Sequence, residues 1–273
     1  MRPVVLSRRL QAVAAIVTAG NRVCDVGCDH GFVPIYLVEQ GISPVVLAMD
    51  VKSGPLSAAR EHIAEHGLED VIQTRLSNGL HNYSIGESDT LICAGMGGRL
   101  MMRILSDDRD KTESFRELIL QPQSEIEQFR AWLREQGYCI TEENMIEEDG
   151  KFYPMMRVET GADTGCSGLH EYADELRKPA KDNDSYLMND TKLCKLNDRY
   201  GPLLLQRRDK TLTDYLRREE RIYEEILSTL KARGLSDEKR MSRYTEVSEL
   251  LADCRLALDI VILKKQDYRS GIR

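Results

Sequence analysis

The chain has 273 residues, of which 41% are hydrophobic and 30% are charged, and its formal net charge is −7. This length allows one large α/β domain plus a smaller one, and the apolar fraction supports a real core. The negative charge argues against a general nucleic-acid coat but leaves room for a local basic patch on an acidic body. No apolar run reaches the roughly 18 residues of a transmembrane helix, so we expect no membrane partner.

Residues 1–20 lack the continuous apolar segment of a signal peptide, so a cytoplasmic protein is expected. The seven cysteines include no Cys-x-x-Cys pair, which indicates reduced thiols and neither disulfides nor zinc ligands. His62 and His66 have a spacing that metals use on a helix, but no third ligand stands nearby. We therefore expect no metal site.

Strands and helices are predicted to alternate over residues 1–160. Apolar residues on one helical face predict a first helix over 6–19. Strands are expected at 22–26, 45–50, 71–76, 89–94 and 116–121. Helices are expected at 33–40, 55–66, 97–105 and 125–136. Residues 138–146 and 151–159 then form an antiparallel hairpin. This order predicts an α/β, Rossmann-like methyltransferase fold with a mostly parallel seven-stranded sheet, in a domain of residues 1–160.

The composition changes after Thr160. Residues 161–198 are rich in glycine, aspartate and asparagine and show little periodicity, which indicates a polar connector. Residues 199–273 contain two heptad-patterned segments separated by Gly234, which predict an α-helical coiled-coil hairpin. Arginines on this arm form either a solvated helix face or an RNA-binding surface. The candidate RNA-binding residues of the arm are Arg207, Arg208, Arg217 and Arg218.

The segment 23–31 is the first candidate for chemistry. A short β-branched strand containing Asp25 leads into a turn with Gly27 and Gly31, and the next strand ends in Asp50. A strand, a glycine turn, a helix and a strand ending in an acid form half of a nucleotide-binding unit, in which the acid accepts hydrogen bonds from ribose hydroxyls. An ordinary strand–turn–helix with chance glycines is the alternative.

The middle position of this turn is Asp29, where a dinucleotide-binding turn has glycine. A carboxylate there would repel a pyrophosphate. It suits S-adenosylmethionine, which has no phosphate and carries a sulfonium and an ammonium group. We therefore favour S-adenosylmethionine over NAD as the cofactor. His30, beside Asp29, is a further site candidate or simply a turn residue.

Two more loops follow predicted strands. Asn78 and Gly79 come after the third strand, where a polar side chain can bond an adenine amine, although Asn-Gly also favours a plain turn. The loop Ala94–Gly98 contains three glycines, which let the backbone pass under a ligand, with Met96 in the pocket. It has no Asn/Asp-Pro-Pro-aromatic tetrad. That absence argues against methylation of an exocyclic amine and permits methylation of a ring nitrogen, whose lone pair is already localised.

These motifs together resemble the bacterial tRNA adenine-22 N1-methyltransferase family. The resemblance rests on segments 6–10, 25–30, 54–56, 78–80, 94–98, 120–122 and 201–205, with Pro34 and Asp50. It implies a methyltransferase domain followed by a coiled coil, S-adenosylmethionine as cofactor and tRNA as partner. Three features depart from the family: Cys28 stands where it usually has serine, Asn78 where it often has an acid, and residues 160–198 are longer and more polar than expected.

We expect transfer of a methyl group to N1 of an adenine, with Asp29 as the catalytic residue that stabilises the cationic product. The expected cofactor-binding residues are Asp25, Gly27, Cys28, Asp29, His30, Asp50, Val51, Asn78, Gly79, Ala94, Gly95, Met96 and Gly97. Arg8 and Arg9 join the arm arginines as RNA-binding candidates. The alternatives are a methyltransferase of a small molecule or protein, and a non-catalytic RNA-binding protein with the same fold. Monomer and dimer both remain open.

Overall fold

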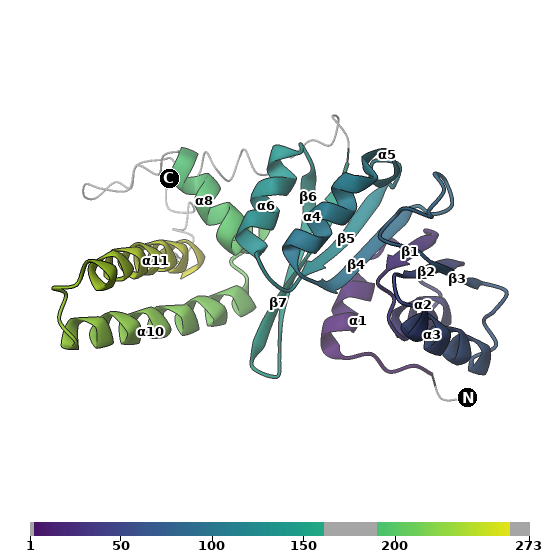
Figure 1. The fold of residues 1–273 in the computed structure, drawn as a ribbon, viewed down its shortest axis with the longest axis horizontal. Coiled ribbons are helices and arrows are strands. Elements are labelled where there is room, and N and C mark those ends of the chain that lie inside the picture. Colours follow the sequence, from purple (N-terminus) through teal and green to yellow (C-terminus); the bar gives the residue numbers. More distant parts are fainter. Residues whose placement is uncertain (1–2, 161–189, 263–273) are drawn as a thin grey trace, which may run out of the picture. The chain divides into compact units, whose positions relative to one another are not determined.

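In the computed structural model, which describes residues 3–160 and 190–262, seven strands form a sheet in the order β3-β2-β1-β4-β5-β7-β6 (Figure 1). The strands are β1 (Val23–Val26), β2 (Val46–Asp50), β3 (Ile72–Leu76), β4 (Thr90–Met96), β5 (Glu117–Pro122), β6 (Cys139–Glu148) and β7 (Lys151–Glu159). Strands β1 to β5 run parallel, and β7 lies antiparallel to both β5 and β6. The predicted methyltransferase-type sheet is thereby confirmed.

Helices pack on both faces of the sheet because its strand side chains alternate between two hydrophobic layers. On one face, Cys24 and Val26 pack with helices α4 and α6, and on the other Val23 packs with α1, α2 and α3. The helices of this unit are α1 (Arg8–Ala15), α2 (Phe32–Glu39), α3 (Ser53–Glu65), α4 (Gly98–Asp107), α5 (Arg109–Thr112) and α6 (Ile126–Glu135). The short α5 was not predicted from the sequence.

The strand order reverses between β1 and β4, which are hydrogen-bonded neighbours although two strands separate them in the chain. Helices that follow β1 and β4 therefore leave on opposite faces of the sheet, and in open α/β sheets a ligand crevice is expected at the carboxyl ends of such strands. The turn after β1 and the loop after β4 both lie at this edge. The topology thus places the segments singled out in the sequence at one end of the sheet.

Residues 190–262 belong to a second compact unit. Its described helices are α8 (Asp190–Tyr200), α9 (Pro202–Gln206), α10 (Lys210–Ala232) and α11 (Glu238–Ile262). Helices α10 and α11 pack against each other as a pair, through buried residues such as Leu212, Leu216 and Val247 (Figure 1). The predicted helical hairpin is present, with its core at the expected heptad positions. Helix α8 begins inside the range 161–198 that was expected to be a connector, and residues 161–189 lie outside the described residues.

A buried charge joins α8 to α11. Asp253 is fully buried and pairs with Lys192 and Lys195, the latter at 3.1 Å. Burial by itself would raise the pKa of Asp253, but the hydrogen bonds from the two lysines lower it below its usual value. The buried carboxylate thus has two lysine partners, with Arg199 Nη1 a further cation at 4.0 Å, and this cluster fixes how α8 and α11 meet.

One sequence expectation needs correction. Cys139, on β6, forms a disulfide bond, whereas reduced thiols had been expected throughout. The other cysteines that the structure describes are free thiols. Among the described helices, none combines the length and the apolar character needed to cross a bilayer.

Candidate active site

The turn after β1 is bound to the end of β2. The backbone N–H groups of Gly27 and Cys28 both donate to the carbonyl oxygen of Met49, at 2.8 and 3.0 Å. Gly27 has φ +80°, and the point where its Cβ would stand lies 2.3 Å from the Met96 methyl carbon of the β4 loop. Glycine is therefore required here both for conformation and for space. This close approach joins the β1 turn to the carboxyl end of β4.

Asp25 is the most unusual charged group at this edge. It is only 4% exposed, and nothing in residues 3–160 or 190–262 donates a hydrogen bond to its carboxylate. Burial, followed by the nearby Asp50 carboxylate, raises the pKa of Asp25 to about 7. A buried carboxylate without a partner is costly, and a cationic ligand group would compensate it.

Asp50, at the end of β2, is also buried but is held by backbone groups. Its Oδ1 accepts from the N–H of Lys52 at 2.8 Å, and its Oδ2 accepts from the N–H of Asp29 at 3.3 Å. Its own carbonyl oxygen accepts from the N–H of Ser77 at 2.9 Å. Asp50 thus connects the β1 turn, the start of α3 and the loop after β3, and each carboxylate oxygen keeps a lone pair for a ligand hydroxyl. The next residue, Val51, is 59% exposed.

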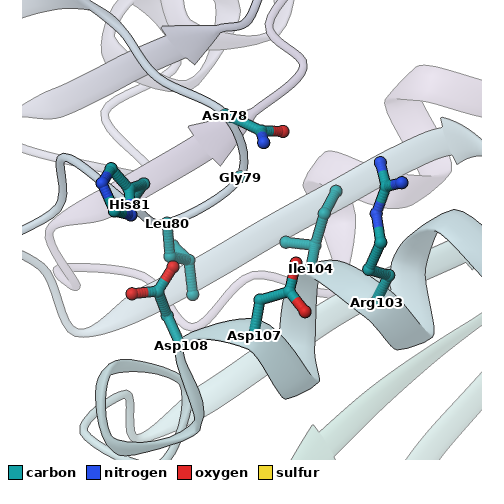
Figure 2. Close-up of a pocket in the computed structure, with 8 residues that line it drawn as sticks. All are labelled: Asn78, Gly79, Leu80, His81, Arg103, Ile104, Asp107 and Asp108. Atoms are coloured by element: carbon teal, nitrogen blue, oxygen red, sulfur yellow. The ribbon is translucent and has the colours of Figure 1, made fainter.

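The loop after β3 borders a small cavity of about 90 Å³ against α4 (Figure 2). Gly79 has φ +57°, and a Cβ there would stand 3.2 Å from Ile104 of α4. Asn78 precedes it and is exposed, with its amide at the cavity rim in Figure 2. The side chain can therefore meet a ligand, although Arg103 and Asp107 also line the same cavity.

The carboxyl end of β4 contains Ala94, Gly95 and Met96, and together with Gly97, which follows it, this end (the β4 loop) is hydrogen-bonded to the loop after β5. Gln123 N–H donates to the Met96 carbonyl oxygen at 2.8 Å, and Gly98 N–H donates to the Ser124 carbonyl oxygen at 3.0 Å. At Gly97 a Cβ would stand 2.9 Å from Ser124 Oγ. The glycines allow two backbones to approach closely, which leaves Gly95 exposed between them.

Arg9, from α1, lies beside Gly95. Its Nη1 donates to Oε1 of the fully buried Gln121 at 2.7 Å, and its guanidinium carbon lies 5.4 Å from the centre of the Tyr153 ring. These contacts fix the guanidinium at the carboxyl end of β5. Gln121 and Gln123 were not included among the expected site residues. For Gln121 the sequence signal is a glutamine directly after the apolar run Leu118–Leu120, and Gln123 carries no such signal.

Asp29 and His30 are exposed residues of the turn after β1. Asp29 adopts φ +49°, which is uncommon for a residue other than glycine, and its side chain is 72% exposed. His30 Nε2 lies 3.6 Å from its Oδ1. Cys28, which precedes Asp29 in the turn, is buried. Burial and the three nearby carboxylates raise the pKa of its thiol, so the thiol stays neutral. The turn thus offers carboxylate oxygens and no thiolate nucleophile.

The other expected RNA-binding residues are Arg8, which precedes Arg9 on α1, and four arginines of the second unit. Arg8 is exposed at the start of α1, where its backbone N–H donates to Glu148. In the second unit, Arg207 pairs with Asp209 at 2.9 Å, and Arg217 and Arg218 are exposed on α10. Arg208 has φ +56° and precedes the α10 cap.

No group of three or more candidate metal ligands occurs in the part of the chain that the structure describes. His62 instead contacts the carbonyl oxygen of His30 through Nδ1 at 2.9 Å, and His66 pairs with Glu39 at 2.7 Å. This edge of the sheet therefore presents carboxylates and glycines, with Arg9 beside Gly95 and Arg103 at the cavity next to Asn78. Such a set suits a ligand that carries positive charge and hydroxyl groups and no phosphate.

Comparisons with known proteins agree with this chemistry. Residues 6–156 match the family model described as a methyltransferase domain. The chain is 35% identical over 161 residues to a Bacillus subtilis tRNA (adenine(22)-N(1))-methyltransferase, covering 59% of this chain and 68% of that one. The crystal structure of the B. subtilis m1A22 tRNA methyltransferase TrmK superimposes with a TM-score of 0.74 at 26% identity, over 94% of this chain and all of that one. A Streptococcus pneumoniae protein in complex with S-adenosyl-L-methionine gives 0.72 at 29% identity, over 93% and 100%.

Proposed function

Because this chain belongs to the tRNA (adenine(22)-N(1))-methyltransferase family, we propose that it methylates N1 of an adenine in tRNA, with S-adenosylmethionine as the methyl donor. The observation that carries this proposal is the buried, unpartnered Asp25 beside Asp50 at the switch point of the sheet. A methyltransferase of small molecules would leave the second unit without a role.

The residues at the crevice fit S-adenosylmethionine. Asp25 would face the ammonium group, and its desolvated carboxylate would gain a partner there. Asp50 would accept from the ribose hydroxyls, and Asn78 would lie at the adenine end. Gly27 and the segment 94–97 would provide the backbone surface on which the cofactor rests. When bound, S-adenosylmethionine supplies an electrophilic methyl group on a sulfonium sulfur.

The protein then has to bind the adenine with N1 free of base pairing, and it has to stabilise the positive charge of the methylated ring. N1 lies on the Watson–Crick edge, so the adenine must leave ordinary pairing to be methylated. As the methyl group leaves the sulfonium sulfur and bonds to N1, the S–C bond breaks and the positive charge passes from the sulfur, which becomes a neutral thioether, to the adenine ring, so no proton has to be removed first. Asp29, whose carboxylate is exposed beside the crevice, would stabilise that positive charge. Its backbone hydrogen bond to Asp50 fixes the turn that carries it.

The RNA would be held by positive groups of both units. Arg9, fixed by Gln121 and Tyr153, and Arg8 would bind near the crevice. The arm would contribute Arg207, Arg208, Arg217 and Arg218. Replacement of Arg217 and Arg218 by glutamine should weaken tRNA binding and flatten its salt dependence by about one log unit of slope per lost phosphate contact. The double change Arg240→Gln and Arg243→Gln on α11 removes equal charge and is the matched control.

We further propose that residues 1–160 form the methyltransferase domain, that 161–198 connect it to the arm and that 199–273 form the coiled-coil domain. The test of function is incubation of the full chain with labelled S-adenosylmethionine and bulk tRNA, followed by nucleoside identification. We expect 1-methyladenosine. Label found in another nucleoside would refute the N1 assignment, and absence of label in tRNA would refute the tRNA substrate.

A further inference from the structure

Two polar side chains converge on the exposed backbone of Gly95. The point where a Cβ of this residue would stand lies 3.5 Å from Nη1 of Arg9 and 3.6 Å from Nε2 of Gln123. Gly95 has φ +80°, which side-chain-bearing residues rarely adopt. The position therefore has no side chain, and its exposed backbone forms a small surface, called the floor below, that is bordered by the Gln123 amide and the Arg9 guanidinium.

Gln123 is anchored but not used by the fold. Its backbone N–H donates to the Met96 carbonyl oxygen at 2.8 Å, so the residue is fixed to the β4 loop. Its side-chain amide forms no hydrogen bond with any residue that the structure describes, and the residue is exposed. Arg9, in contrast, already donates to Gln121. The carboxamide of Gln123 thus keeps both an acceptor oxygen and an NH₂ donor for a ligand.

A carboxamide distinguishes adenine from guanine when it binds along one edge of the ring. Its oxygen accepts from the N6 amino group while its NH₂ donates to N7. Guanine carries an oxygen at position 6, which would face the amide oxygen without a hydrogen bond. Binding on the N6 and N7 edge leaves N1 free, because N1 lies on the Watson–Crick edge. An amide at this position can therefore hold an adenine without blocking the atom to be methylated.

We propose that Gln123 specifies adenine in the RNA site by binding the N6 and N7 edge of the target base above Gly95. The assignment rests on the proposed tRNA adenine-N1 methyltransferase function. Gln123 contacts the substrate base, and Arg9 borders the same floor. The residue determines which base is accepted, whereas Asp25 and Asp50 serve the cofactor.

The test combines a change in the protein with a change in one atom of the RNA. Single-turnover methylation is measured on tRNA that carries either adenosine or 7-deazaadenosine at the methylated position. In the unaltered protein, loss of the N7 acceptor should slow the reaction between about 5-fold and 150-fold, the range of a good base-specific contact. Gln123→Leu should slow methylation of adenosine by a similar factor and show no further loss on 7-deazaadenosine.

Gln123→Glu should reverse the order of the methylation rates on adenosine and 7-deazaadenosine. Its carboxylate would present an acceptor to N7, so this variant should methylate 7-deazaadenosine faster than adenosine. Gln128→Leu is the matched control, because Gln128 is also exposed and lies on the neighbouring α6. It should behave like the unaltered protein. Calorimetry with S-adenosylmethionine should give affinities within about twofold for every variant, which shows that the cofactor site is intact.

Two failures are distinguishable. If the unaltered protein forms no 1-methyladenosine in tRNA, the proposed function itself is wrong. If it forms 1-methyladenosine but the 7-deaza penalty is the same in the unaltered protein and in Gln123→Leu, only the Gln123 assignment is overturned. Absence of a 7-deaza penalty in the unaltered protein overturns it as well.

Discussion

Replacement of Asp25 by asparagine should stabilise the amino-terminal unit and at the same time weaken cofactor binding. Asp25 is 4% exposed, receives no hydrogen bond from the described residues and has its pKa raised to about 7 by burial and by Asp50. Folding at neutral pH therefore has to bury a carboxylate that resists ionisation. Asparagine has nearly the same shape and no charge, so the substitution removes this cost and retains the volume.

The magnitude follows from the difference between the folded and unfolded pKa of Asp25. Between about pH 4 and pH 7 the unfolded chain has lost this proton and the folded chain keeps it, so the free energy of unfolding falls by about 1.4 kcal/mol per pH unit. Over the three units from the usual value to about 7, the penalty reaches about 4 kcal/mol. It is absent below pH 4, grows up to pH 7 and stays constant above. The stabilisation of Asp25→Asn should follow the same profile.

Cofactor binding should move in the opposite direction. A carboxylate paired with the ammonium group of S-adenosylmethionine must be ionised, so affinity for the unaltered protein should fall about tenfold per pH unit below pH 7. Asp25→Asn should bind roughly 10- to 100-fold more weakly at pH 8, the value of a charge-assisted hydrogen bond, and without this pH dependence. If Asp25 had only a structural role, its replacement by asparagine would not raise the stability of the protein and at the same time lower its affinity for the cofactor.

Urea unfolding at pH 5, 6, 7 and 8 measures the first effect, and calorimetry measures the second. Trp132 is the single tryptophan and lies on α6, so its fluorescence reports the amino-terminal unit alone. Asp70→Asn, at an exposed position between α3 and β3, is the matched control and should change neither quantity. Equal pH profiles for the unaltered protein and Asp25→Asn would refute the reasoning.

Three further changes test other parts of the site and fold. Asp50→Ala should weaken binding of S-adenosylmethionine by about 10- to 100-fold in calorimetry, because it removes a charged acceptor; unchanged affinity would remove Asp50 from the site. Gly27→Ala places a Cβ 2.3 Å from the Met96 methyl carbon at φ +80° and should cost at least about 1 kcal/mol in urea unfolding. Glu143→Gln removes one partner of a 2.9 Å ion pair with Arg130, both almost fully buried, and should cost about 3–5 kcal/mol, seen as a lower urea midpoint.

The sheet could be predicted from the sequence because its strands are short apolar segments separated by turn residues. The expected strand at 22–26 corresponds to β1 (Val23–Val26), and the expected 151–159 corresponds to β7 (Lys151–Glu159). Both depend on local alternation and on nearby glycines, which a sequence shows directly. The short α5 has no periodic pattern of its own, which is why the sequence did not indicate it.

The coiled-coil pattern was also local information. Heptad positions of α10 predict burial, and Leu212 and Leu216 are indeed fully buried, whereas Leu230 near the loop is only partly buried. The pattern states which face turns inward but not how well the partner helix covers it. The polar network around Asp253 could not be predicted because its lysines lie about 60 residues earlier, on α8, and a local pattern does not show which distant residues meet.

The convergence around Gly95 could not be predicted for the same physical reason. Arg9 and Gln121 are 112 residues apart in the chain, and only the packing of α1 beside β5 brings their side chains within 2.7 Å. Glycine motifs announce a close approach of backbones, but they do not say which side chains will border it. Asp25 and Asp50, in contrast, lie near the carboxyl ends of neighbouring strands of one βαβ unit, so their proximity is implied by topology.

Asp29 remains the sharpest test of catalysis, because two explanations of its presence predict different results. Its φ of +49° is one that aspartate and asparagine tolerate better than most residues, so it could serve the turn alone. Asp29→Asn keeps this tolerance and the backbone hydrogen bond to Asp50, and it removes only the charge. If the carboxylate stabilises the cationic adenine, single-turnover methylation should fall more than about tenfold, while affinity for S-adenosylmethionine changes less than about threefold. Asp29→Gly, which relieves the backbone and removes the side chain, should be equally slow. If the rate for Asp29→Asn stays within about threefold of the unaltered protein, Asp29 serves only the conformation of the turn, and another group must stabilise the positive charge.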